Sequence, residues 1–274
     1  MTDPVYAPGH SDRELERLNA QSRLIEHITR QYFRAAGIGT GMRVLDVGSG
    51  AGHTAFLAAD LVGEKGEVIG VDRVATAVEV ATRTAKSRGL RNVIFLEGDP
   101  AEMAFDLPFD AVVGRYVLLF QADPAAMVRK LAGHLRPGGT IVFHEPEWDK
   151  ARSIPPAPTY DRCCRWISDT FRLSGTPDMD MGVRLYRAFV DAGLPAPSMR
   201  LQTFIGGGAE SMDWLQAVAE LVISLLPAME QLGVATAAEV EATSLPERLR
   251  REVSAGGGVV IGRSEIGVWS NLHR

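Results

Sequence analysis

The sequence has little cysteine and no long uninterrupted apolar run. Its two cysteines, Cys163 and Cys164, are adjacent, which is poor geometry for an ordinary disulfide, so no cross-linked framework is expected. No apolar stretch reaches the roughly 18 residues needed to span a bilayer, and residues 1–10 contain no apolar signal region. These absences favour a chain that works in a reducing cytoplasm without a membrane partner.

Basic residues are also in the minority, with 29 Lys and Arg against 34 Asp and Glu and a net charge of -5 at pH 7. This charge balance gives no overall positive electrostatic potential that would attract nucleic acid, so RNA or DNA is not expected as a partner. The spacings H-E-x-x-H and paired C-x-x-C are absent, so no metal site is expected. The chain's length allows about three quarters of its unfolded surface to be buried, enough for one core with an elaboration or for two small domains.

The most informative motif present is an acid followed by a glycine-rich loop. The segment reads Val44-Leu45-Asp46-Val47-Gly48-Ser49-Gly50-Ala51-Gly52. Its apolar start is typical of a buried parallel strand, and its glycines allow positive φ and close approach of the backbone to a ligand. A dinucleotide site would have G-x-G-x-x-G, but here position 53 is His53. Asp46 would repel a pyrophosphate and attract an ammonium group, which favours a cation-bearing nucleoside over NAD.

Comparable motifs follow the next apolar runs in the chain. They are Asp72-Arg73 after residues 68–71, Gly98-Asp99-Pro100-Ala101 after residues 95–97, and Gly114-Arg115 after residues 109–113. A fifth strand is predicted at residues 140–143, after Pro137-Gly138-Gly139. In this order and spacing the motifs cover residues 37–148, and the chain there resembles the class I S-adenosylmethionine-dependent methyltransferases. Within that class it looks most like the small-molecule branch related to the quinone C-methyltransferases.

The resemblance implies S-adenosylmethionine as cofactor and S-adenosylhomocysteine as product. It implies that Asp72 holds the ribose hydroxyls, that Asp99 faces the adenine amino group, and that the Gly114 carbonyl meets the ligand's amino group. The core residues expected to bind the cofactor are Asp46, Gly48, Ser49, Gly50, Asp72, Arg73, Gly98, Asp99, Pro100, Ala101, Gly114 and Arg115. A modest similarity of the N-terminal block to a leader helix that closes over the cofactor adds Tyr6 and Gln21.

The alternation of predicted helices and strands indicates a doubly wound α/β fold. The resemblance implies a seven-stranded, mostly parallel Rossmann-like sheet with helical lid insertions. The expected organisation is an N-terminal capping helix at 1–36, a cofactor core at 37–148, a helical lid segment at 149–180, a core continuation at 181–208, a helical lid insertion at 209–256 and a last core strand at 257–274. The insertion serves either as a lid over the acceptor or as the interface of a homodimer.

Catalysis is predicted at the carboxyl end of the fifth strand, the edge where ligands bind in open α/β sheets. His144 and Glu145 are the candidate general bases there, but neighbouring residues on a strand face opposite ways, so only one should enter the site. The expected acceptor is a small apolar or aromatic metabolite, methylated at carbon or oxygen, with secondary metabolism as its setting. The alternatives are a protein or RNA acceptor, and a cofactor-binding scaffold without turnover.

Overall fold

The structure is a computed structural model that describes residues 12–174 and 180–272. The chain divides into two compact units. The sheet unit comprises Glu26–Glu145, Met181–Arg200 and Ile266–Arg274, and the helical unit comprises Met1–Ile25, Pro146–Asp180 and Leu201–Glu265. Each unit is therefore built from three separate stretches of sequence.

The sheet unit is organised around a parallel sheet. Its strands are β1 (Arg43–Val47), β2 (Glu67–Asp72), β3 (Val93–Glu97), β4 (Phe109–Arg115), β5 (Leu135–Glu147) and β8 (Val259–Asn271), the last two continuing into the helical unit. Their order is β3-β2-β1-β4-β5-β8, and β1 to β5 pair in parallel. Because β1 lies between β2 and β4, the chain reverses its direction of winding there, and such a switch point opens a ligand crevice at the carboxyl ends of the strands.

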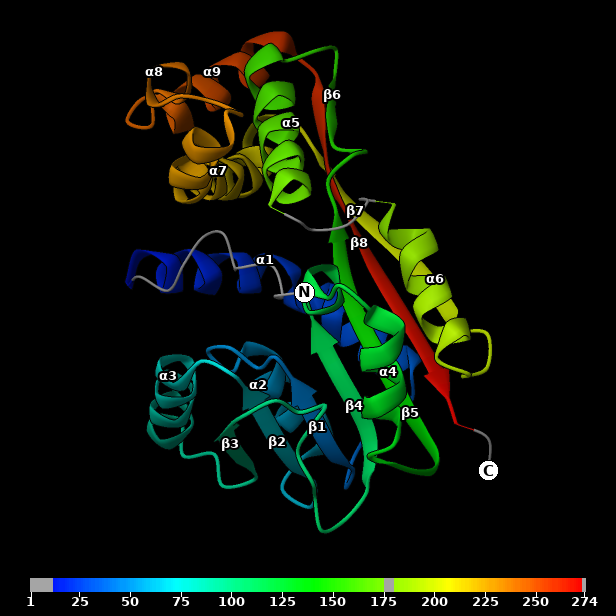
Figure 1. Cartoon of the computed structure of the whole chain (residues 1–274). Coiled ribbons are helices and arrows are strands. Elements are labelled where there is room, and N and C mark those ends of the chain that lie inside the picture. Colours follow the sequence, from blue (N-terminus) through cyan, green and yellow to red (C-terminus); the bar gives the residue numbers. More distant parts are fainter. Residues whose placement is uncertain (1–11, 175–179, 273–274) are drawn as a thin grey trace. The chain divides into compact units, whose positions relative to one another are not determined.

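Helices cover both faces of this sheet (Figure 1). In β1, Leu45 packs into one apolar cluster and Val44 into the other, because alternate side chains of a strand face opposite ways. The first cluster includes residues of η1 (Leu118–Phe120), α4 (Pro124–Ala132) and α6 (Met181–Asp191), and the second includes residues of α2 (His53–Val62) and the end of α1 (Asp12–Ala35). A further helix, α3 (Ala75–Ser87), packs beside β2 and β3.

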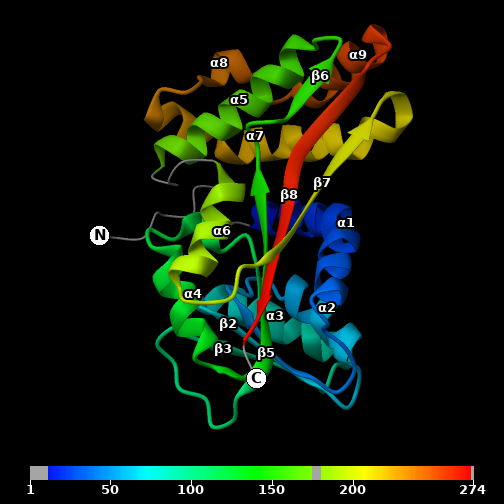
Figure 2. The ribbon, with the colours of Figure 1, turned by 90° about the vertical axis from the view of Figure 1, so that its right-hand side faces the viewer.

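The helical unit is built around α7, which packs against α5 and α9 (Figure 2). Its elements are β6 (Arg152–Ile154), α5 (Pro158–Leu173), β7 (Ser198–Gly206, from its fourth residue), η2 (Gly208–Ser211), α7 (Met212–Leu232), α8 (Ala237–Val240), α9 (Leu245–Gly256), and the first parts of α1 and β8. Strand β6 pairs antiparallel with β8, and β7 also pairs with β8. Cys163 and Cys164 are buried on α5, and burial raises the pKa of the Cys163 thiol to about 12, so both serve packing.

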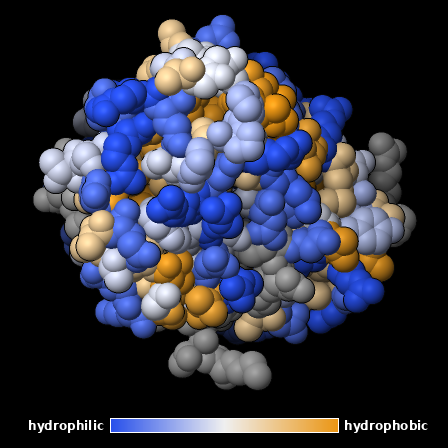
Figure 3. Space-filling view, turned by 90° about the horizontal axis from the view of Figure 1, so that it is seen from above, coloured by the Kyte–Doolittle hydropathy of each residue, from blue (hydrophilic) through white to orange (hydrophobic). Residues whose placement is uncertain are grey.

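One helical segment is long and apolar enough to cross a membrane by length and composition, contrary to the expectation from the sequence. Within residues Gly208–Leu232, a window of 18 residues reaches a mean hydropathy of 1.3. Their apolar face, which includes Leu215, Val222 and Leu225, is buried within the helical unit, as in the core helix of a globular domain. On the face drawn in Figure 3, hydrophobic side chains lie in separate groups among hydrophilic ones. Length and composition therefore give only weak support for a membrane span.

The doubly wound α/β prediction is confirmed, with eight strands where seven were expected. The extra strand is β6, whose three residues carry no periodic signal. The strands predicted at 198–205 and 258–269 correspond to β7 and β8. Residues 149–180 and 209–256, predicted as lid segments, fall in the helical unit, whereas the predicted capping helix at 1–36 is divided between the units after Ile25. A lid role for these segments stays a prediction.

Candidate cofactor site

The glycine loop joins β1 to α2 with three left-handed glycines. Gly48, Gly50 and Gly52 have φ of 62°, 50° and 91°. A Cβ on Gly52 would lie 2.8 Å from the rings of Phe56 and Phe95, whereas a Cβ on Gly50 would meet no atom within 4 Å. Gly52 is therefore required by packing inside the unit, but Gly50 borders open space. The prediction that the glycines let a ligand approach the backbone is consistent with the surroundings of Gly50.

Asp46 is the most unusual side chain of the site. It is fully buried on β1, and neither of its carboxylate oxygens has a hydrogen-bond partner among the described residues. Burial, the largest effect, raises the pKa of Asp46 well above its ordinary value. The nearby Arg115 guanidinium opposes this shift, Asp72 adds to it, and the backbone N–H of Ala55, outside hydrogen-bond geometry, lowers the pKa slightly. The hydroxyl of Ser49 is likewise buried and without a partner in the described part of the chain. Such groups are costly unless ordered water or a ligand satisfies them.

The two acids at the ends of β2 and β3 order their own loops. Asp72 accepts the backbone N–H of Gly50 at 2.8 Å through one oxygen and that of Val74 at 2.9 Å through the other. Asp99 accepts the N–H of Ala101 at 2.9 Å and pairs with Arg73, whose Nη2 lies 2.6 Å from Oδ2. The side chain of Asp99 stays 28% exposed. Since each oxygen has a second lone pair, these bonds leave capacity for a ligand.

Backbone contacts hold the predicted adenine-side residues in place. The N–H of Gly98 donates to the carbonyl of Asp72 at 3.0 Å, so the loop after β3 is tied to the end of β2. The carbonyl of Pro100 lies 2.8 Å from Nε2 of His134. At Gly114 a Cβ would lie 2.5 Å from the ring of Phe143, so the close packing of β4 on β5 requires glycine there.

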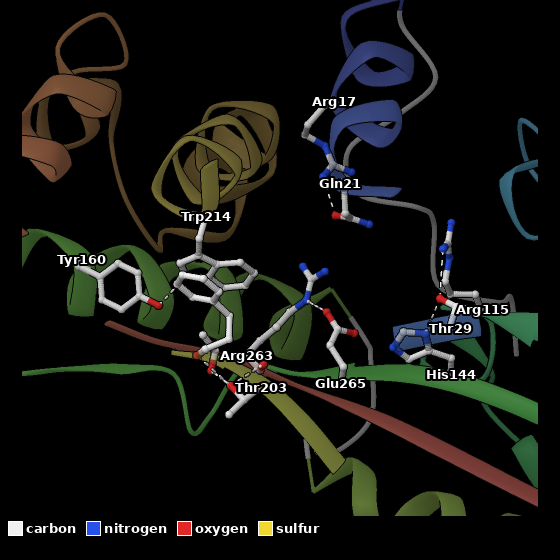
Figure 4. A network of polar contacts seen from close by, with 12 residues as sticks. Arg17, Gln21, Thr29, Arg115, His144, Tyr160, Thr203, Trp214, Arg263 and Glu265 are labelled. Carbon is white, nitrogen blue, oxygen red and sulfur yellow. Dashed lines mark hydrogen bonds and ion pairs between the residues drawn. The ribbon is translucent and has the colours of Figure 1, made fainter. Parts of the chain in front are cut away.

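His144 and Glu145 point to opposite faces of β5, as strand alternation predicts. His144 is fully buried, with Nδ1 3.0 Å from Oγ1 of Thr29 on α1 (Figure 4). Its ring meets those of Tyr32 and Tyr116 edge to face, at centroid distances of 5.1 and 5.6 Å. Arg115 donates to the same threonine hydroxyl at 3.3 Å.

Glu145 binds the start of η1. Its Oε1 accepts the N–H groups of Val117 and Leu118 at 2.9 and 2.8 Å, and its Oε2 accepts that of Leu119 at 3.3 Å. Burial raises the pKa of Glu145 to about 7, although these three hydrogen bonds and the charge of Arg184 oppose the shift. These contacts give Glu145 a structural role in fixing the loop after β4. Its role as a base stays a prediction.

The predicted residues thus lie along one edge of the sheet unit, at the ends of β1 to β5, apart from two. Tyr6 lies outside the described residues. Gln21 belongs to the helical unit, where its Oε1 accepts a hydrogen bond of 2.8 Å from Arg17. The sequence interpretation missed Thr29, although a hydroxyl residue four positions after Ile25 on the apolar face of a predicted helix is a readable signal.

The sequence matches the family described as "Methyltransferase domain" over residues 38–176, just over half of the 274 residues. This match confirms the resemblance noted in the sequence and S-adenosylmethionine as the cofactor of the family.

Three relatives show how far the similarity extends. Aklanonic acid methyltransferase DauC of Streptomyces sp. (strain C5) is 39% identical over 108 residues, 39% of this chain and 49% of that protein. Demethylmenaquinone methyltransferase of Lactococcus lactis subsp. lactis is 32% identical over 107 residues, 39% of this chain and 42% of that protein. Protein-L-isoaspartate O-methyltransferase of Pyrococcus horikoshii is 30% identical over 135 residues, 49% of this chain and 58% of that protein. The chain therefore spans about half of the length of these relatives.

Among solved structures, the YcgJ protein of Bacillus subtilis superposes with a TM-score of 0.58 at 20% identity, covering 91% of this chain and 99% of that one. At this identity the likeness shows the fold.

Proposed function

Because the chain belongs to the methyltransferase-domain family, we propose that it transfers the methyl group of S-adenosylmethionine to a small, apolar or aromatic metabolite, at carbon or oxygen. Two relatives are named for small-molecule acceptors, aklanonic acid and demethylmenaquinone, which supports this acceptor class. The apolar composition of α7 supports it too, since pockets for such molecules are mostly hydrophobic with few polar groups.

The observation that carries the proposal is that the carboxylate of Asp46 and the hydroxyl of Ser49, three residues later, are both buried and have no hydrogen-bond partner among the residues that the structure describes. An amino-acid tail offers an ammonium group that would satisfy the carboxylate, and a pyrophosphate offers only repulsion. The first turn of α2 begins at His53 behind a glycine without a side-chain cap, so its N–H groups suit the carboxylate of the same tail. The site therefore fits a zwitterionic nucleoside.

The remaining residues would orient the ligand and the acceptor. Asp72 and Asp99, with lone pairs to spare, would bind the ribose hydroxyls and the adenine amino group. When bound, the cofactor supplies an electrophilic methyl group on sulfur, so the protein's task is to align the nucleophile, exclude water and, for some acceptors, remove a proton. We propose either His144 or Glu145 for that proton, although the burial of both also suits catalysis by alignment alone.

A second acceptor class is a protein side chain. The similarity to a protein-L-isoaspartate O-methyltransferase favours it, and it requires the same cofactor site. From the sequence we also propose a cytoplasmic location, a homodimer and a role in secondary metabolism. These proposals belong with a small-molecule acceptor.

Methyl transfer tests the proposal. The protein is incubated with S-adenosylmethionine labelled in its methyl group and with a panel of naphthols, quinones, aromatic acids and an isoaspartyl peptide. Label in a small aromatic product supports the first class, and label in the peptide supports the second. Binding of S-adenosylhomocysteine without transfer to any acceptor would point to a scaffold without turnover. Absence of binding by folded protein would overturn the cofactor assignment.

A further inference from the structure

The segment that follows β4 packs against two glycines of the candidate cofactor site, within the sheet unit. Val117 lies two residues beyond the end of β4. A Cβ added to Gly48 would lie 2.9 Å from Cγ2 of Val117, and a Cβ added to Gly114 would lie 3.5 Å from the same methyl group. The Val117 side chain therefore contacts both the glycine loop after β1 and the end of β4, the two places where the amino-acid end of the cofactor is expected.

The backbone just before Val117 is strained. Tyr116 has a φ of 60°, a left-handed conformation that aromatic residues rarely adopt. Its N–H donates to the carbonyl of His144 at 2.9 Å, and its ring meets the His144 ring edge to face. Such conformations persist only where the surroundings hold them, and they are common at ligand sites. Here the strained residue directly precedes the side chain that packs on the two glycines.

Glu145 holds the other side of this turn. Its buried carboxylate accepts the N–H groups of Val117, Leu118 and Leu119. Arg184 of α6 donates to the carbonyl of Leu119 at 3.4 Å, and its positive charge also acts on the carboxylate. An ionised carboxylate only accepts hydrogen bonds, so it can bind all three donors at once. A protonated carboxyl group or an amide carries a donor at one of its two positions, and would hold the turn less firmly.

We propose that Glu145 is a positioning residue for the cofactor: through Val117 it holds the glycine loop in the conformation that binds the amino-acid end of S-adenosylmethionine. Affinity falls in proportion to the fraction of molecules whose site is in the binding conformation, so a restraint on the loop strengthens binding without contact to the ligand. This role uses the accepting oxygens of Glu145 and does not require it to act as a base. The benefit to the cofactor depends on the function proposed above, but the restraint on the loop does not.

Hydrogen exchange of the free protein tests the restraint. Residues 47–52 are followed in the unsubstituted protein, in Glu145→Gln, and in Val117→Ala, which removes the methyl group that packs on Gly48. We expect this segment to exchange severalfold faster in both variants. The matched control is Val128→Ala, because Val128 is fully buried in the same apolar cluster but belongs to α4. Exchange of residues 47–52 that is unchanged in Val117→Ala, or equally fast in Val128→Ala, would overturn the proposal.

Calorimetry with S-adenosylhomocysteine tests the consequence for the cofactor. Val117→Ala and Glu145→Gln should each weaken binding by about two- to tenfold, the affinity equivalent of one ordinary hydrogen bond. Val128→Ala should lower Tm without changing this affinity. Because Glu145 acts through Val117, adding Glu145→Gln to Val117→Ala should cause little further loss.

Two results of this titration would contradict the proposal. One is an unchanged affinity in either folded single variant, and the other is a double variant in which the two losses multiply. Should Glu145→Gln fail to fold, Val117→Ala and its control still give the answer.

The pH profile distinguishes positioning from a purely structural role. Burial raises the pKa of Glu145 to about 7, so below that pH the protonated side chain resembles glutamine in its hydrogen bonding. The difference in affinity between the unsubstituted protein and Glu145→Gln should therefore shrink from about pH 8 to about pH 6. Asp46, whose pKa is also raised, is present in both proteins, so its ionisation does not contribute to the difference. A difference that stays constant over this range would refute the positioning role.

The same measurements separate this inference from the proposed function. Equal S-adenosylhomocysteine affinities in all variants would remove the positioning role and leave the cofactor assignment intact. Absence of binding by the folded, unsubstituted protein would overturn the cofactor assignment and, with it, the role of Glu145 toward the cofactor.

Discussion

Replacing Asp46 by asparagine should weaken cofactor binding and at the same time stabilise the free protein. The carboxylate is fully buried and has no hydrogen-bond partner among the described residues, and asparagine has the same shape without the charge. A hydrogen bond between a carboxylate and an ammonium contributes about 1.5–3 kcal/mol, so S-adenosylhomocysteine should bind about 10- to 100-fold more weakly.

The free protein should respond in the opposite direction. Removing a charge that burial disfavours should raise the free energy of unfolding by about 1 kcal/mol, or Tm by about 2 °C for a chain of this size. Because burial raises the pKa of Asp46 well above its ordinary value, the folded state holds the proton more tightly than the unfolded state. Stability of the unsubstituted protein therefore falls as the pH rises from about 4 toward the raised pKa, and the advantage of the variant grows over that range.

Calorimetry and thermal unfolding between pH 4 and 8 measure both effects. Adenosine, which lacks the amino-acid tail, should bind both proteins equally. Asp106→Asn, at an exposed position, is the control for a carboxylate-to-amide change and should alter neither affinity nor Tm. An equal loss of affinity for adenosine and S-adenosylhomocysteine, or a lower Tm for the Asp46 variant, would refute the reasoning.

Three further changes test other parts of the site. Gly50→Ala should abolish most S-adenosylhomocysteine binding, because the added methyl group would occupy the open space where the ligand approaches the backbone. The control is Gly41→Ala, with a similarly left-handed φ and equally open surroundings, which should cost only about 1 kcal/mol of stability. Equal S-adenosylhomocysteine binding by both variants in calorimetry would contradict a ligand contact at Gly50. Glu145→Gln should flatten the pH dependence of Tm between about 4.5 and 7, because the raised pKa of Glu145 makes the unsubstituted protein lose stability as the pH rises through that window. Thr29→Val should lower the unfolding free energy by about 1–2 kcal/mol in denaturant titrations, since the hydroxyl that contacts His144 and Arg115 is removed from a buried place.

The sheet unit was largely predictable because short, continuous segments of the sequence determine its strands, turns and helix starts. An apolar run followed by an acid and glycines defines a strand, a turn and a helix start in one short segment, as at Asp46 and Gly48. Parallel strands bring their carboxyl ends to one edge, so such segments predict a site without any knowledge of long-range contacts. The alternation of His144 and Glu145 followed from strand geometry for the same reason.

The helical unit was less predictable because its contacts join distant parts of the chain. Trp148 and Trp214 are 66 positions apart, and nothing in either local sequence indicates that their rings stack. The ion pair of Arg263 and Glu265 did leave a signal, since two opposite charges at alternate positions of an apolar strand must share a face.

In the sheet unit, the structural role of Glu145 could not be predicted for a similar reason. Its contacts come from a separate segment, η1, and a motif at one strand end does not reveal them.

Four of the five boundaries between the two units fall inside regular structure, within α1 after Ile25, within β5 after Glu145, within β7 after Arg200 and within β8 after Glu265, and the fifth, after Asp180, immediately precedes α6. Independent domains normally meet at exposed linkers that can be cut without breaking a hydrogen-bonded ladder. Excising either unit here would sever one helix and three strands, leaving frayed ends and unpaired backbone groups. Side chains of the helical segments are therefore better exchanged in place than by swapping these segments as a module.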